Sequence, residues 1–187
     1  MCGRYRLDLN ADLSFLAGAK EGEIFPTDRV TVLLAGTKAG SIAIDQLSWG
    51  FTSGSGKPLI NARAETVLEK PTFCQPFRQS RCVFPTTGFY EWDRSNHKAK
   101  TLFNAQVGGA LYLAGFYRDR ECIILTRAAS PSFATVHDRM PLILEANQIR
   151  AYLHEESFAV ECLTQSTPEL VIEKIEKHKS DEFALGL

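Results

Sequence analysis

The apolar residues of this chain fall in short runs separated by glycine, proline, asparagine and serine, and this pattern constrains the fold more than any other feature. Runs that are rich in β-branched and aromatic side chains are typical of strands. We expect strands in VTVLL, SIAIDQL, RCVFP, GFYEW, ALYLAGFYR, ECIILTRAA, MPLIL and FAVECLT. A Gly-Gly pair ahead of ALYLAGF predicts a hairpin turn. The sequence therefore predicts many short strands.

The expected helices are short and lie between or after these runs. Asn10 can cap a helix in NADLSFLAG, and Ser130 precedes Pro131 in SPSFATVH, which are helix-start signals. Two further helices are expected, in ANQIRAYLH and TPELVIEKIEKH. Because the strands do not alternate regularly with long helices, we predict an α+β fold. It is expected to be mostly antiparallel, with a barrel-like β core and short peripheral helices.

Length and composition fit one domain, because 187 residues without a repeat, linker or low-complexity segment form a single core. We expect this domain to span residues 1–187, with residues 145–187 as its acidic helix/strand/helix segment. No apolar run is long enough to cross a membrane, and MCGRYRLDLN lacks the layout of a signal peptide. We therefore expect a cytoplasmic protein with no membrane partner, associated with the nucleoid if it is bacterial.

The charges are distributed unevenly along the chain. Residues 1–140 hold 17 Lys and Arg against 13 Asp and Glu, whereas residues 141–187 hold 4 against 9. The net charge of −1 thus combines a basic body with an acidic tail. A local basic groove for nucleic acid fits this distribution, and so does a solvated surface of mixed charge.

The five cysteines indicate neither a disulfide framework nor a zinc site, because their number is odd and no two form a CxxC pair. We expect no metal and no cofactor. Cys122 and Cys162 lie in apolar runs, where a free cysteine behaves as a small hydrophobe, so we expect both in the core.

Cys2 stands apart, because it becomes the first residue once the initiator Met1 is removed, as is usual ahead of a small side chain. The residue would then carry an α-amine with a reference pKa of about 7.7–8.0 beside a thiol of about 8.5. Near neutral pH both groups have an appreciable reactive fraction. Such a pair has few uses in a purely structural role.

Three other stretches, NARAET, PTTGFYEW and VHDRMP, concentrate reactive or anion-binding groups. An extended NARAET would point Asn61 and Arg63 to one side, although a surface turn fits the same letters. In GFYEW a strand sends Glu91 to the face opposite Tyr90 and Trp92. Burial there would make Glu91 a proton donor near neutral pH, and a strand-end glutamate paired with an arginine is the alternative.

VHDRMP places His137 in a loop between a predicted helix and a strand, where functional residues often lie. A histidine there can transfer protons, because its reference pKa is about 6.5, although a lone histidine is more often structural. We assign His97, His154 and His178 to surface or helix positions, since none has a reactive neighbour in the sequence.

Several motifs in order resemble the SOS response-associated peptidase (SRAP) family, and the resemblance runs from Cys2 to about Leu144. They are MCGRY, Trp49-Gly50, NARAET, CVFPTTGFYEW, LAGFY and VHDRMPLIL. The resemblance implies a protein that senses and shields abasic sites in single-stranded DNA, and not a conventional peptidase. It implies an enzyme that crosslinks itself to DNA. The family name refers to a peptidase, which is a hydrolase, and a lyase reaction is a further expectation.

The resemblance implies that the Cys2 amine attacks the aldehyde of a ring-opened abasic sugar to form a Schiff base. The Cys2 thiol would then close a five-membered thiazolidine, which proximity favours. In this interpretation Asn61 holds the Cys2 amine and Glu91 assists ring opening and proton transfer. His137 handles protons around the imine and in reversal of the crosslink.

For DNA binding, the resemblance implies phosphate contacts from Arg4, Arg63 and Arg139, whose forked donors match phosphate oxygens. Trp49 would lie near the DNA, where an aromatic ring can stack on a base, although a core tryptophan is the alternative. Pro26 also belongs to a family segment that shapes the DNA groove.

The chain departs from the family pattern in two places. In EIFPTDRV, Pro26 and Thr27 match the usual Asn-x-Ala-Pro-Thr segment, but Phe25 replaces the small residue and the asparagine is missing. FTSGSGKPLI, after Trp49-Gly50, is shorter than usual. Both changes concern preference for strand junctions more than the Cys2 chemistry.

Three other functions stay open at this point. Amidotransferases with an N-terminal nucleophile also begin Met-Cys-Gly, but a start motif needs its context, and here Arg4 follows without a synthase domain. A noncovalent reader of modified bases would need a basic groove and aromatic residues but not Cys2. A protease that processes itself at Cys2 is the third.

Overall fold

The computed structural model describes residues 2–93, 99–104, 109–165 and 171–174, and these form a mixed α+β fold rich in sheet. The strands are β1 (Tyr5–Leu7), β2 (Gly22–Ile24), β3 (Arg29–Ala35), β4 (Ile42–Trp49), β5 (Asn61–Arg63), β6 (Arg81–Thr86), β7 (Gly88–Asp93), β8 (Ala99–Asn104), β9 (Leu111–Arg118), β10 (Glu121–Ala128), β11 (Arg139–Pro141), β12 (Ile143–Leu144) and β13 (Val171–Lys174). The helices are α1 (Pro71–Gln79), α2 (Pro131–Ala134), α3 (Ile149–His154) and α4 (Glu156–Cys162), with 3₁₀ turns η1 (Ala11–Leu16), η2 (Ala64–Thr66) and η3 (Ala146–Gln148). The predicted α+β class is confirmed.

The strands form two sheets. In the larger one, neighbouring strands pair in the spatial order β10-β4-β3-β6-β9. Because β9 also pairs with β10, these strands close a ring. The smaller sheet has the order β13-β8-β7-β1-β2. All described pairings are antiparallel except those of β10 with β4 and β5. This confirms the mostly antiparallel character that is predicted from strands not alternating regularly with long helices.

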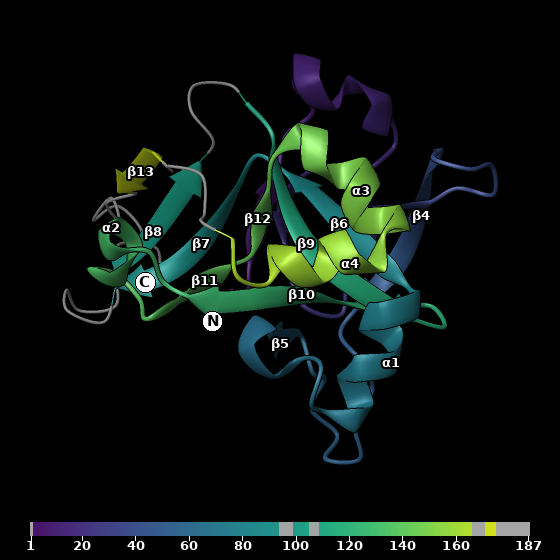
Figure 1. Ribbon diagram of the computed structural model, residues 1–187. Coiled ribbons are helices and arrows are strands. Elements are labelled where there is room, and N and C mark those ends of the chain that lie inside the picture. The colour runs from purple at the N-terminus through teal and green to yellow at the C-terminus, as the bar shows by residue number, and fades with distance from the viewer. Residues whose placement is uncertain (1, 94–98, 105–108, 166–170, 175–187) are drawn as a thin grey trace.

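The core fills the ring and extends beneath the helices. All six residues of β6 are buried, including the apolar run CVFP. Helices α1 and α3 pack against β6, while α2 lies near β8 and β13 at the opposite side of the molecule (Figure 1). Phe77 of α1 meets Phe116 of β9 edge to face, with ring centroids 6.0 Å apart. This packing holds α1 against β9.

Gly115 of β9 is required by a close approach inside the ring. A Cβ built at this position would lie 2.4 Å from the carbonyl oxygen of Ile123 and 2.5 Å from the ring of Phe84. No side chain fits in that space, so glycine lets β9 pass tightly between β6 and β10.

Three predicted elements are wrong. FAVECLT forms helix α4, in which the buried Ala159 and Cys162 are three residues apart on one helical face. The predicted helix 167–178 is strand β13 at Val171–Lys174, where pairing with β8 decides the conformation, and its other residues lie outside the described ones. The Gly-Gly hairpin does not form between β8 and β9, which belong to different sheets.

The other predicted strands are present, as are the helices at η1, α2 and η3–α3. Asn10 caps η1 as expected, because its side chain accepts a hydrogen bond from the backbone of Leu13. Cys122 and Cys162 are buried in the core. His154 contacts the carbonyl oxygen of Ser41, while His97 and His178 lie outside the described residues. Across the described ranges no helix is long and apolar enough to span a membrane.

Candidate active site

Cys2 lies directly ahead of β1 and is completely buried. The side-chain amide of Asn61, from β5, donates a hydrogen bond to the carbonyl oxygen of Cys2, with Nδ2 and O 2.9 Å apart. The other amide atom, Asn61 Oδ1, is also buried and accepts no hydrogen bond from the described residues. Two predicted site residues that are far apart in the sequence therefore meet.

Glu91 enters the same region from β7. Its side chain is only 3% exposed, on the strand face opposite Tyr90 and Trp92, as the alternation predicts. Burial and, second, the nearby negative charge of Glu91 raise the pKa of the Cys2 thiol well above its usual range. The thiol is therefore protonated near neutral pH.

His137 lies in the loop between α2 and β11, and its Nε2 is 3.9 Å from Oε2 of Glu91. The other ring nitrogen, Nδ1, has two neighbours. The backbone N–H of Arg139 donates to it at 3.0 Å, and Oδ1 of Asp138 lies 2.9 Å away. A neutral Nδ1 accepts from Arg139, whereas a protonated Nδ1 donates to Asp138. His137 thus has a partner in each protonation state, so it can exchange a proton without leaving its position.

Strand β10 brings the motifs NARAET and VHDRMP together. One edge of its second half pairs with β5, where Thr126 lies opposite Arg63. The other edge pairs with β11, where Ala128 lies opposite Arg139. The predicted catalytic residues Cys2, Asn61, Glu91 and His137 therefore come from four separate segments that meet beside this strand.

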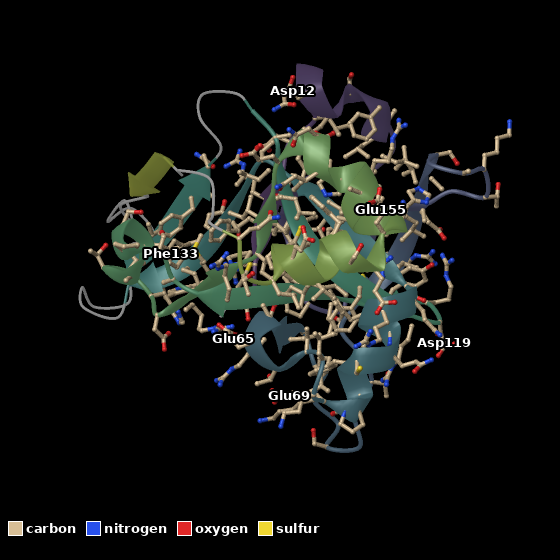
Figure 2. All side chains as sticks on the ribbon, in the orientation of Figure 1. Asp12, Glu65, Glu69, Asp119, Phe133 and Glu155 are labelled. Carbon is tan, nitrogen blue, oxygen red and sulfur yellow. The ribbon has the colours of Figure 1, made fainter. Side chains whose placement is uncertain are left out.

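Arg139 is held by Glu65, a residue that the sequence did not single out. Its guanidinium forms a bidentate pair with the Glu65 carboxylate, at 2.6 and 2.9 Å, and also donates to the carbonyl oxygen of Thr126 at 2.7 Å. Figure 2 labels Glu65 beside β5. The Arg139 backbone contacts His137. By holding the Arg139 side chain, Glu65 and Thr126 therefore steady the loop that carries the histidine. The predicted phosphate contact of Arg139 would have to form beside this pair.

The ion pair makes a pH-dependent prediction. The Arg139 hydrogen bond lowers the pKa of Glu65 from 4.5 to about 2, so the pair stabilises the fold above about pH 4.5 and is lost as pH falls toward 2. We expect Glu65→Gln to unfold at lower urea than wild type at pH 7. Since the Glu65 side chain is 46% exposed, screening limits the loss to about 1 kcal/mol.

Urea unfolding from pH 7 down to pH 2 measures this effect. The difference between wild type and Glu65→Gln should shrink below pH 4.5 and vanish near pH 2. Glu69→Gln, on the same exposed turn, is the matched control and should change little at any pH (Figure 2). A Glu65→Gln difference that does not vary with pH would contradict the assignment.

The two other predicted DNA-binding arginines differ in their surroundings. Arg4 pairs with Glu23 at 3.1 Å, and its guanidinium lies over the rings of Phe25 and Trp92. Arg63 is exposed, and within the described parts of the chain no acidic side chain pairs with it. Arg63 is therefore the predicted arginine with the most accessible charge.

Trp49 is a core residue in this fold. It is fully buried, its indole donates to the carbonyl oxygen of Ile60 at 3.0 Å, and its ring packs on Tyr5. No face of the ring is open to a base, which corrects the predicted stacking role. Pro26 is half-buried in the turn that follows Phe25.

No group of His, Cys, Asp and Glu side chains that could hold a metal ion occurs among the described residues. The functional groups near Cys2 are its own thiol, the amide of Asn61, the carboxylate of Glu91 and the imidazole of His137. Such groups can act as nucleophile, hydrogen-bond partner and proton carrier toward a carbonyl compound.

Comparison with known proteins agrees with this reading of the motifs. The chain is 28% identical over 183 residues to abasic site processing protein YobE of Bacillus subtilis, and the match covers 84% of each chain. It is 28% identical over 179 residues to abasic site processing protein YedK of Escherichia coli, covering 83% of this chain and 81% of the relative.

The fold is also shared with solved structures. A protein from Bordetella bronchiseptica superposes with a TM-score of 0.77 at 21% identity, covering 94% of this chain and all of that one. A protein from Bacteroides thetaiotaomicron gives a TM-score of 0.76 at 17% identity, covering 94% and 93%. The sequence pattern of the family described as SOS response associated peptidase (SRAP) matches residues 1–179. The chain belongs to the SRAP family.

Proposed function

We propose that this chain processes abasic sites in DNA, by binding the single strand and crosslinking the abasic sugar to Cys2. Its relatives are named abasic site processing proteins. The observation that carries the proposal is the gathering of Cys2, Asn61, Glu91 and His137 from four segments, with Asn61 hydrogen-bonded to Cys2 and His137 beside Glu91. The first bond of this proposal needs a free α-amine on Cys2, so removal of Met1 is the first step.

The amine of Cys2 makes the first bond. It attacks the aldehyde carbon of the ring-opened sugar, and loss of one water gives the imine. Burial raises the pKa of the Cys2 thiol, which disfavours sulfur as the first nucleophile. The buried Oδ1 of Asn61 is an acceptor that can orient an N–H of the freed amine.

The thiol makes the second bond. Sulfur adds to the imine carbon and its proton moves to the nitrogen, so the five-membered thiazolidine forms without an oxidant or reductant. Glu91 lies close enough to affect the thiol pKa and is the base that carries this proton. Amine and thiol share one residue, so ring closure is intramolecular and strongly favoured.

Glu91 and His137 also act on the sugar before and after crosslinking. Glu91 assists the closed sugar by taking the proton of its C1′ hydroxyl and returning it to the ring oxygen. In reversal, the departing sulfur needs a proton, and His137 can deliver one while keeping its hydrogen-bond partners. The same site therefore serves formation and reversal.

Arg63 is the residue through which we test binding to the single strand. A lost phosphate contact lowers the slope of log K against log salt by about 0.7 for single strands. Arg63→Ala should weaken binding to an undamaged oligonucleotide and reduce this slope. Arg150→Ala, which removes an exposed arginine from α3, is the control. Equal slopes for Arg63→Ala and wild type would remove Arg63 from the DNA path.

The function itself is tested by incubating the protein with a single-stranded oligonucleotide that carries one abasic site. We expect a shifted band that resists denaturation, and no such band with an undamaged strand. The competing activities are checked on the same preparation, since glutaminase turnover would support an amidotransferase. Tight binding to modified bases without a crosslink would support a noncovalent reader.

A further inference from the structure

Phe25 is exposed at the border of the active site. Within the described parts of the chain five large hydrophobic side chains are exposed: Phe15, Phe25, Ile42, Ile44 and Leu59. Of these, Phe25 contacts a predicted site residue, because the guanidinium carbon of Arg4 lies 4.3 Å from its ring centroid. The residue is 40% exposed.

Phe25 is the outermost layer of a stack. The Arg4 guanidinium lies 5.0 Å from the ring of Trp92 as well as 4.3 Å from that of Phe25. In the β1–β2 register Tyr5 lies opposite Ile24, so Arg4 and Phe25 are the next residues outward on each strand. Arg4 is two residues from Cys2, and Trp92 follows Glu91. Trp92 points to the strand face opposite Glu91, so Arg4 is the member of the stack nearest to Cys2 along the chain, and Phe25 is its exposed end.

The backbone holds Phe25 in place. Its N–H donates to Oδ2 of Asp28 at 2.8 Å, and its carbonyl oxygen accepts from the Asp28 N–H at 3.1 Å. The ring of Pro26 fixes the φ angle of that residue, and Thr27 has a φ of 76° in the tight turn. The backbone of Phe25 is thus held in place and its ring packs on Arg4, so little conformational entropy is lost when the ring binds another group.

We propose that Phe25 stacks on a DNA base that flanks the abasic site, which rests on the proposed function. An abasic nucleotide leaves one face of its neighbouring base without a stacking partner. A phenyl ring can cover that face whatever the base, because every base has a π-face. Trp49 is buried and cannot do so. Phe25, which departs from the family pattern, is the exposed ring at this border.

The test measures binding to a single strand that contains one tetrahydrofuran residue, an abasic analogue without an aldehyde. One oligonucleotide has adenines on both sides of it, and a second has tetrahydrofuran on both sides. Phe25→Ala should raise the Kd for the first about tenfold, the size expected for one stacked base. It should leave the Kd for the second unchanged. Phe25→Trp should bind the adenine-flanked strand at least as well as wild type.

Two controls separate stacking from other effects. Phe25→Leu keeps apolar bulk over Arg4 but removes the aromatic face, so it should bind like Phe25→Ala. Phe15→Ala removes an exposed phenylalanine elsewhere and should change nothing. An equal loss on both oligonucleotides would mean that Phe25 acts only through Arg4, and no loss on either would exclude the contact. Either result would overturn this inference even if the wild type crosslinks a true abasic site. If the wild type does not crosslink such a site, the proposed function itself is overturned.

Discussion

Cys2→Ala will form no stable crosslink with an abasic single strand. The substitution keeps a free α-amine once Met1 is removed, but it removes the sulfur that closes the thiazolidine. We therefore expect the reaction to stop at the imine, which water reverses. An adduct should appear only when borohydride is added to reduce that imine. The readout is the shifted band on a denaturing gel with and without reductant.

A chain with an extension ahead of Met1 should form neither adduct, because its α-amine is blocked. Cys74→Ala is the matched control, since Cys74 is a free, partly exposed cysteine on α1 and should be dispensable. If Cys2→Ala gave a stable crosslink of unchanged yield without reductant, the thiazolidine mechanism would be wrong. If the extended chain crosslinked normally, another amine would be the nucleophile.

Glu91→Gln will slow crosslink formation about a hundredfold, the lower end of what a general acid–base group contributes. The shape of the side chain is preserved, but its ability to accept a proton is lost. The substitution also removes the negative charge that helps to raise the pKa of the Cys2 thiol. If thiol ionisation alone limited the rate, Glu91→Gln would therefore react faster than wild type. The direction of the change separates the two roles.

His137→Ala should instead preserve a crosslink once it has formed, because reversal needs a proton on the departing sulfur or nitrogen. A chase with excess unlabelled abasic DNA follows exchange of a labelled strand from the preformed crosslink. Slower exchange in His137→Ala than in wild type is the expected result. Equal exchange would remove His137 from reversal, and normal formation in Glu91→Gln would leave Glu91 with a structural role.

Much of this site could be predicted from the sequence because its key residues lie in short motifs. Asn61, Glu91 and His137 were named in three separate motifs, and each lies near Cys2 or its neighbour in the structure. The pair of Glu65 and Arg139 could not be predicted, because it depends on β5 and β11 lying at the two edges of β10. An acidic residue in one motif and a basic residue in another do not reveal that the two side chains form a pair in the fold.

The environment of individual aromatic residues was also not predictable. Trp49 and Phe25 both precede turns, and nothing in their neighbouring letters indicates that one is buried and the other exposed. Secondary structure, too, was predictable for some segments and not for others. ECIILTRAA is rich in β-branched residues and forms β10, whereas residues 171–174 join β8 as a strand despite a helical pattern. Pairing partners outside the segment decide such cases, because tertiary contacts override weak local propensity.

The central claim is that a covalent bond joins Cys2 to the abasic sugar, and mass spectrometry of the crosslinked protein tests it most directly. The intact adduct should have the mass of the chain without Met1 plus that of the DNA, minus one water. After nuclease and protease digestion, the sugar remnant should lie on the N-terminal peptide that begins at Cys2, without any reductant in the reaction. A remnant on a lysine side chain, or an adduct that still contains Met1, would contradict the account.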